Sequence, residues 1–217
     1  SSILVFMPDP ASSTDPRKRP RQARSMATFD VVLEGAAHIL ETKGLHGFNT
    51  NAVARQAGVS IGSLYQYFPS KEALLVELIR RKRTALIEKM QDASSRLEAS
   101  DLRTIADGLV RAGIAHWVER PELARSLEYA ETTLDLGPET EALKRQIVVV
   151  VAKALAPHGV ENPETAARDL AALTRGMADS SGPFGKADVS QLEQRVRRAV
   201  YGYLGISDSN PLTSVRR

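Results

Sequence analysis

The sequence predicts an all-α protein of about nine helices. Apolar residues recur at helical spacing along most of the 217 residues, and Pro and Gly separate the periodic segments. Residues 50–74, TNAVARQAGVSIGSLYQYFPSKEAL, read as a short helix, a Gly-containing turn, a second short helix and the start of a third. This pattern is a helix-turn-helix, which indicates a surface that reads duplex DNA.

Capping residues set the limits of the short helices. Thr50 is predicted to cap the first, because its hydroxyl can accept a free N–H group of the first turn. Gly58 then ends that helix in the left-handed conformation that glycine adopts at little cost. Ser60 is predicted to cap the second helix, Pro69 to stop it, and Ser70 to cap the third.

The second short helix is expected to have a buried face and a slim exposed end. Leu64 and Phe68 lie four residues apart and can anchor the helix inward. Gly62 and Ser63 keep its start narrow enough for a major groove about 12 Å wide.

Seven further helices are expected from the same periodicity. Their predicted ranges are 26–43, 70–98, 101–120, 121 to about 134, 139–156, 163 to about 178, and 188 to about 204. Within 139–156, the four consecutive valines from Val148 also suit a strand. The sequence shows no internal repeat.

Composition excludes several classes of protein. The chain has no cysteine, so we expect neither a disulfide framework nor a thiolate metal site. No apolar run approaches the ~20 residues of a membrane helix, and the opening segment lacks the basic region of a signal peptide. His116 and His158 have no companion at ligand spacing, so no metal or other cofactor is expected.

Positive charge is concentrated around the helix-turn-helix. Residues 16–83 hold 12 Lys/Arg and 5 Asp/Glu, a balance of +7, whereas residues 84–217 hold 17 and 19, a balance of −2. A surface that binds phosphates needs such a local excess.

Two basic clusters contribute to this excess. The first comprises Arg17, Lys18, Arg19, Arg21 and Arg24. This cluster could enter a minor groove as an arm, or be a solvated tail. The second comprises Arg80, Arg81, Lys82 and Arg83. That cluster could touch flanking phosphates, or form an exposed helix face.

The motif resembles the DNA-binding segment of TetR-type bacterial transcriptional regulators, whose pattern is T-x-x-x-[IV]-A-x-x-A-G-V-S-x-G-[ST]-L-Y-x-Y-F-x-S-K-E-x-L. The matching residues are Thr50, Val53, Ala54, Ala57, Gly58, Val59, Ser60, Gly62, Ser63, Leu64, Tyr65, Tyr67, Phe68, Ser70, Lys71, Glu72 and Leu74. The match covers residues 28–75 well, and beyond them only length and helical character agree.

The resemblance implies two sets of DNA contacts. Residues placed toward base edges are Ile61, Gly62, Ser63 and Gln66. Ile61 would meet a thymine methyl group, and Gln66 could read adenine. Residues placed on phosphates are Thr50, Asn51, Tyr65, Tyr67 and Lys71, and the hydroxyls of the tyrosines and the cation of Lys71 suit this role on chemical grounds as well.

The resemblance also implies a second domain that dimerises and binds a ligand. The expected divisions are 1–23, a disordered basic arm; 24–75, the DNA-binding head; 76–204, the helical ligand-binding and dimerisation domain; and 205–217, a flexible tail. Candidate pocket residues are His116, Trp117, Tyr129, Met177 and Phe184. Candidate dimer-interface residues are Leu170, Leu173, Met177, Leu192, Val196, Val200 and Tyr203, although such apolar stripes are equally typical of a core.

These expectations combine into a functional hypothesis. The chain is expected to be a cytoplasmic, ligand-responsive repressor that binds a palindromic operator as a homodimer and releases it on binding a small apolar or amphipathic effector. One alternative is a ligand-independent or architectural DNA-binding protein. The other is an enzyme that uses the helical domain, but the sequence contains no nucleophile–base motif, phosphate loop or metal cluster to support catalysis.

Overall fold

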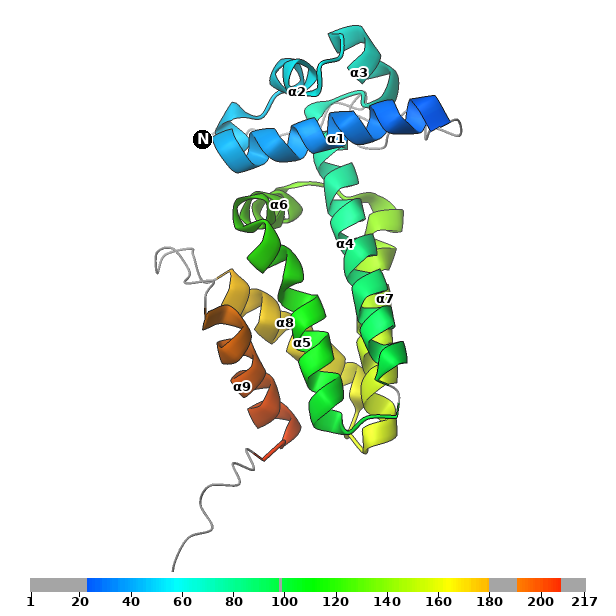
Figure 1. Cartoon of the computed structure of the whole chain (residues 1–217), viewed down its shortest axis with the longest axis vertical. Coiled ribbons are helices and arrows are strands. Elements are labelled where there is room, and N and C mark those ends of the chain that lie inside the picture. The colour runs from blue at the N-terminus through cyan, green and yellow to red at the C-terminus, as the bar shows by residue number, and fades with distance from the viewer. Residues whose placement is uncertain (1–22, 98, 180–190, 208–217) are drawn as a thin grey trace, which may run out of the picture. The chain divides into compact units, whose positions relative to one another are not determined.

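The described residues of the computed structural model, 23–97, 99–179 and 191–207, are helical with no strand, which confirms the predicted fold class (Figure 1). The α-helices are α1 (Ala23–Lys43), α2 (Thr50–Ala57), α3 (Ile61–Tyr67), α4 (Lys71–Arg96), α5 (Leu102–Glu119), α6 (Pro121–Thr133), α7 (Gly137–Leu155), α8 (Pro163–Ala178) and α9 (Leu192–Leu204). Two short 3-10 helices, Leu45–Gly47 and Ala156–His158, follow α1 and α7. The valine run therefore lies in a helix.

The described residues divide into two compact units. Unit 1 contains the residues up to Thr84 together with Arg120–Lys144, and unit 2 contains Ala85–Glu119 and the residues from Arg145 onward. Helix α4 contributes to both units. This division differs from the boundary expected after residue 75, because α6 and the first part of α7 pack with the DNA-binding head.

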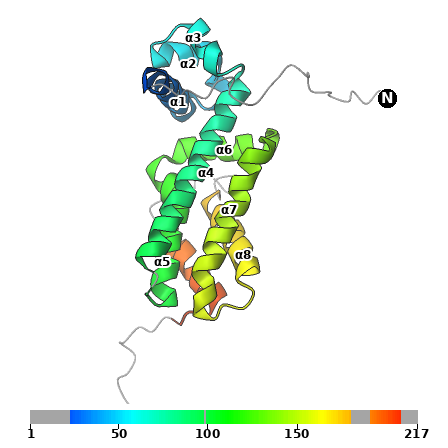
Figure 2. The same ribbon diagram turned by 90° about the vertical axis from the view of Figure 1, so that its right-hand side faces the viewer.

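Unit 1 has one apolar core. Helix α1 packs against α2 on one side and α6 on the other (Figure 1, Figure 2). The rings of Phe29 and Phe68 stack with centroids 4.7 Å apart. Leu64 and Phe68 are fully buried, as predicted. Leu127 and Leu136 join the same core, which explains why residues from the second half of the chain belong to this unit.

Gly35 allows α1 and α2 to approach closely. A Cβ atom at this position would lie 3.1 Å from Ala57 Cβ, 3.2 Å from Ala57 N and 3.3 Å from Ala57 Cα. Two of these atoms belong to the backbone, so no side-chain rotation can relieve the contact. This requirement joins two helices, and no local pattern in the sequence predicts it.

The caps of the short helices follow the predictions with one exception. Gly58 ends α2 with φ 65°, and the Ser60 hydroxyl accepts from Ser63 N at 3.0 Å. Asn49, and not Thr50, caps α2, since its Oδ1 accepts from Ala52 N at 2.9 Å. Asn49 is the extended residue before the helix, whereas Thr50 already belongs to the first turn. A cap must have non-helical backbone geometry, which selects Asn49.

Unit 2 is held by contacts among α5, α8 and α9. The Tyr201 hydroxyl of α9 donates to Asp107 Oδ1 of α5 at 2.6 Å, and Arg197 Nε lies 2.9 Å from the same oxygen. Val118 of α5 is 52% exposed. In the part of the chain that the structure describes, no helix is long and apolar enough to cross a membrane.

Candidate nucleic-acid interface

The outer surface of α3 carries the residues predicted to read bases. Ile61 is 37% exposed, although it is an isoleucine in a helix that packs on an apolar core. Gly62 and Gln66 are also exposed, and Ser63 is partly so. A Cβ on Gly62 would meet only Ser60 Oγ, at 3.8 Å. The internal packing of unit 1 therefore gives no reason for a glycine there.

A hydrogen bond joins α2 to α3 at this surface. Thr50 Oγ1 and Tyr65 Oη are 3.1 Å apart, and Tyr65 is 40% exposed. The bond brings together two hydroxyls that were both predicted to meet phosphates, and it fixes the phenol of α3 against the first turn of α2. Asn51, the next residue of α2, is exposed.

Tyr67 places its ring in the core of unit 1. Its side chain is only 9% exposed, and its ring meets the edge of Phe29 with centroids 5.9 Å apart. Helical spacing explains this burial, because Tyr67 falls on the same side of α3 as Leu64. The ring therefore belongs to the core, and a contact of the Tyr67 hydroxyl with phosphate stays a prediction.

The surface has an electrostatic character that suits DNA. Residues 49–71 contain two cations, Arg55 and Lys71, and no Asp or Glu. Both cations are exposed, and the carboxylate near Lys71 is Glu72, at 4.0 Å. Arg55 was not among the predicted DNA-binding residues, although its place within the motif was visible.

The four cations of residues 80–83 pair with carboxylates of unit 1. Arg80 Nε donates to Glu77 Oε2 at 2.7 Å, and Arg81 pairs with Asp30 of α1. Both predicted alternatives, phosphate contact and an exposed face, fail for Lys82 and Arg83, since their side chains are only 10% and 4% exposed.

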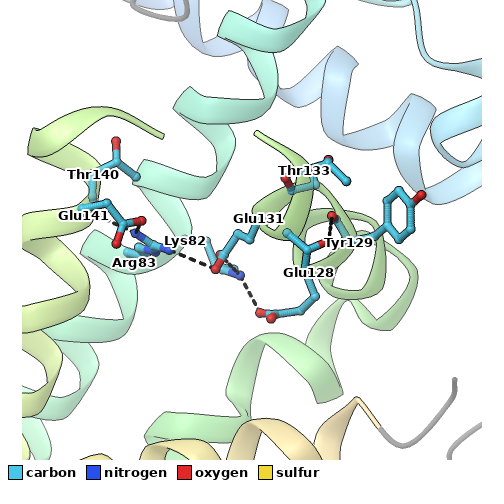
Figure 3. A network of polar contacts seen from close by, with 10 residues as sticks. Lys82, Arg83, Glu128, Tyr129, Glu131, Thr133, Thr140 and Glu141 are labelled. Atoms are coloured by element: carbon cyan, nitrogen blue, oxygen red, sulfur yellow. Dashed lines mark hydrogen bonds and ion pairs between the residues drawn. The ribbon is translucent and has the colours of Figure 1, made fainter. Parts of the chain in front are cut away.

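Lys82 and Arg83 belong to a polar network among α4, α6 and α7 (Figure 3). Lys82 Nζ donates to Glu128 Oε1 at 2.8 Å and to Glu131 Oε1 at 2.6 Å. Arg83 donates to Glu131 Oε2 at 3.0 Å and to the Thr140 carbonyl at 2.6 Å. Burial by itself raises the pKa of Glu131, but the charges and hydrogen bonds of Lys82 and Arg83 outweigh it and hold the pKa below the usual value.

A second set of ion pairs ties the start of α6 to α1. Arg120 Nε donates to Glu41 Oε1 at 2.6 Å, and its other nitrogens bond Glu34 at 2.8 and 3.2 Å. The hydrogen bond from Arg120 lowers the pKa of Glu41 despite partial burial. These ion pairs are more exposed than those of Lys82, so water screens them and they contribute little to the free energy of unfolding. Their main effect is to orient α6 against α1.

The predicted pocket residues do not form one group. Trp117 is buried in unit 2 beside His116, with ring centroids 5.3 Å apart, and Met177 is partly buried in α8. Tyr129 belongs to unit 1 and is 63% exposed, so it does not line an enclosed pocket. Phe184 lies outside the described residues. In the described ranges, no cluster of three or more metal-ligating side chains occurs.

Most of the predicted dimer-interface residues are core residues of unit 2. Leu170, Leu192, Val196 and Val200 are buried within the single chain, so they are wrong as interface positions. Their stripes pack α8 and α9 against each other and against α5. Three residues of that set keep exposed surface that a partner could meet, namely Leu173, Met177 and Tyr203.

Comparison with known proteins agrees with this geometry. The family model described as bacterial regulatory proteins, tetR family, matches residues 32–78, and the model described as tetracyclin repressor-like, C-terminal domain, matches residues 101–204. The chain belongs to the TetR family. TetR-family proteins are transcriptional regulators, and the two models match an N-terminal and a C-terminal segment of this chain.

Individual members of the TetR family resemble the chain to different extents. The fatty acid metabolism regulator protein of Bacillus subtilis is 33% identical over 61 residues, which cover 28% of this chain and 31% of that protein. A putative TetR-family regulator from Mesorhizobium loti superposes with TM-score 0.68 at 21% identity, covering 85% of this chain and 98% of that one. The fatty acid degradation regulator FadR from Bacillus halodurans gives TM-score 0.64 at 18% identity, covering 84% and 96%.

Gly62 provides a direct test of the interface in this TetR-family head. Gly62→Ala is expected to leave the free energy of unfolding unchanged or to raise it by up to about 1 kcal/mol, because alanine favours the helix and its methyl group meets no clash. The same change is expected to weaken binding to duplex DNA about tenfold, measured by fluorescence anisotropy, since the methyl group points from an exposed helix face.

The matched control for Gly62 is Gly113→Ala in α5, where an added Cβ makes only ordinary van der Waals contacts, with Met90 Cε at 3.6 Å and Thr174 Cγ2 at 3.7 Å. That variant should gain helix stability and keep the DNA affinity of the wild type. Equal DNA binding by Gly62→Ala and the wild type would contradict a close approach of DNA to α3.

Proposed function

We propose that the protein is a ligand-responsive repressor that acts in the bacterial cytoplasm and binds a palindromic operator as a homodimer. The observation that carries this proposal is the exposed face of α3. It presents Ile61 and a glycine that internal packing does not require, on a segment without carboxylates. Contact with a major groove accounts for such a face better than exposure to solvent does.

The proposed reading of DNA divides between bases and backbone. Ile61 meets a thymine methyl group and Gln66 reads adenine in the major groove. Thr50, Tyr65 and Lys71 hold the head on phosphates, with the Thr50–Tyr65 hydrogen bond keeping the two hydroxyls in a fixed relation.

The size of the reading helix supports dimerisation. Helix α3 has seven residues and can reach only a few base pairs, so two copies related by a two-fold axis are needed for a specific site. We propose that α8 and α9 supply the contact. Residues on their exposed sides include Tyr203, whose hydroxyl donates to Asp169 Oδ2 at 2.6 Å across the two helices.

Regulation is proposed to act as a population shift. An effector that binds better to dimers with wrongly spaced heads would weaken operator binding, and operator would weaken effector binding by the same factor. Helix α4 is the proposed connection because it is continuous from the head into unit 2. The fatty acid regulators among the similar proteins support an apolar or amphipathic effector.

Two substitutions separate the reading role from the positioning role. Ile61→Ala should relax preference at one base pair by about 1–3 kcal/mol and leave binding to random DNA nearly unchanged. Lys71→Ala should weaken binding to every sequence and reduce its dependence on salt, because it removes a phosphate contact. Both are measured by titrating each variant with a selected duplex and a scrambled duplex. An equal loss on both duplexes for Ile61→Ala would refute its reading role.

A further inference from the structure

The described arginines of unit 1 differ in whether they pair with a carboxylate. The structure describes the side chains of Arg55, Arg80, Arg81, Arg83, Arg120 and Arg125. All but one donate to a carboxylate of the same unit, the acceptors being Glu77, Asp30, Glu131, Glu41 and Glu122 in turn. The exception is Arg55, which is exposed and has no carboxylate partner among the described residues.

The position of Arg55 places it beside the reading surface. Arg55 follows Asn51 by four residues on α2, so the two side chains share one exposed stripe. The stripe begins next to Thr50, which bonds Tyr65 of α3. No Asp or Glu occurs anywhere between Asn49 and Lys71 to attract the guanidinium.

We propose that Arg55 contacts the DNA backbone and helps to hold α2 on the duplex. This assignment rests on the proposed function and adds a residue to it. A guanidinium can donate two parallel hydrogen bonds to one phosphate, which a lysine ammonium does not reproduce in the same geometry. Together with Lys71 at the start of α4, Arg55 gives the head one cation in the last turn of α2 and another shortly after α3.

A purely local role for Arg55 makes a different prediction. Arg55 lies in the last turn of α2, where a cation interacts favourably with the helix dipole. Removal of that interaction would change the stability of the head, but it would not change how DNA binding depends on salt. The two roles can therefore be separated by one set of measurements.

The test compares Arg55→Gln, Arg55→Lys and the wild type on one duplex recovered by selection from a random pool. Affinity is measured between about 50 and 200 mM salt, because the phosphate contribution changes strongly over this range. Arg55→Gln should bind about tenfold more weakly at low salt, and the slope of log affinity against log salt should fall by about 0.9 for each phosphate that the variant no longer neutralises. Arg55→Lys should keep the slope of the wild type.

Lys144→Gln is the matched control, because Lys144 is an exposed cation of α7 in the same unit without a carboxylate partner in the described ranges. It removes the same charge and should leave affinity and slope unchanged. A wild-type slope in Arg55→Gln, with or without a lower melting temperature, would overturn the assignment of Arg55 alone. Failure of the wild type to bind any duplex would overturn the proposed function and this assignment together.

Discussion

Replacing Glu131 by glutamine is expected to lower the free energy of unfolding by about 3–5 kcal/mol. Glu131 is the carboxylate that bonds both Lys82, at 2.6 Å, and Arg83, at 3.0 Å. The substitution preserves shape but leaves two buried cations with less negative charge. Removing one partner of a buried ion pair costs far more than the net gain from forming the pair, because the remaining charge is poorly solvated. Denaturant unfolding of both proteins measures the difference.

The same helix offers a control for Glu131→Gln. Glu122 pairs with Arg125 at 2.6 Å, but both side chains are well exposed. Glu122→Gln should therefore cost no more than about 1 kcal/mol. If the two substitutions had equal effects, the network around Lys82 would not be a significant source of stability.

The effect of Glu131→Gln should depend on pH in a definite direction. The folded-state pKa of Glu131 is lowered, although burial opposes the shift, because Lys82 and Arg83 favour the charged carboxylate. A lowered pKa contributes stability that is complete above the ordinary pKa of glutamate and is lost as pH falls through the folded value. The difference in the free energy of unfolding between the wild type and Glu131→Gln should thus be constant near neutral pH and should become smaller in acid.

Replacing Gly35 by valine is expected to destabilise unit 1 by about 1–3 kcal/mol. The first added carbon would already lie 3.2 Å from Ala57 N and 3.3 Å from Ala57 Cα, and the two further methyl groups need still more room. Relief requires α2 to move away from α1, which also displaces the reading surface. DNA affinity should therefore fall together with stability.

Gly62→Val is the control for Gly35→Val, because it adds the same side chain to a helical glycine of the same head. An added Cβ there meets only Ser60 Oγ, at 3.8 Å. Thermal unfolding of Gly62→Val should match the wild type within about 1 kcal/mol. A Gly35→Val protein as stable as this control would show that the approach of α1 to α2 is not tight.

Local signals in the sequence predicted the fold of the head well. Gly58, Ser60 and Ser70 act where backbone geometry and a nearby hydroxyl decide the structure, and such effects extend over only three or four residues. The error at Thr50 was a shift of one position to Asn49. Helix ends are the least certain part of any prediction based on capping, since adjacent polar residues compete for the role.

Long-range pairing could not be predicted in the same way. The carboxylates that pair with Lys82 and Arg83 lie 46 to 58 residues away in the sequence. In the sequence alone, residues 80–83 therefore resemble a run of unpaired positive charge. Likewise, an apolar stripe such as that of Leu192, Val196 and Val200 has the same spacing whether it packs within one chain or against a second. The structure assigns these three residues to the core.

Selection of bound duplexes from a random DNA pool, carried out with the wild-type protein at two salt concentrations, is the decisive test of sequence-specific DNA binding by a dimer. We expect an enriched palindrome with two half-sites, bound much more tightly than random DNA at both concentrations. Salt-sensitive binding without any enriched sequence would contradict a sequence-specific dimeric regulator, and would indicate a protein that recognises only the DNA backbone.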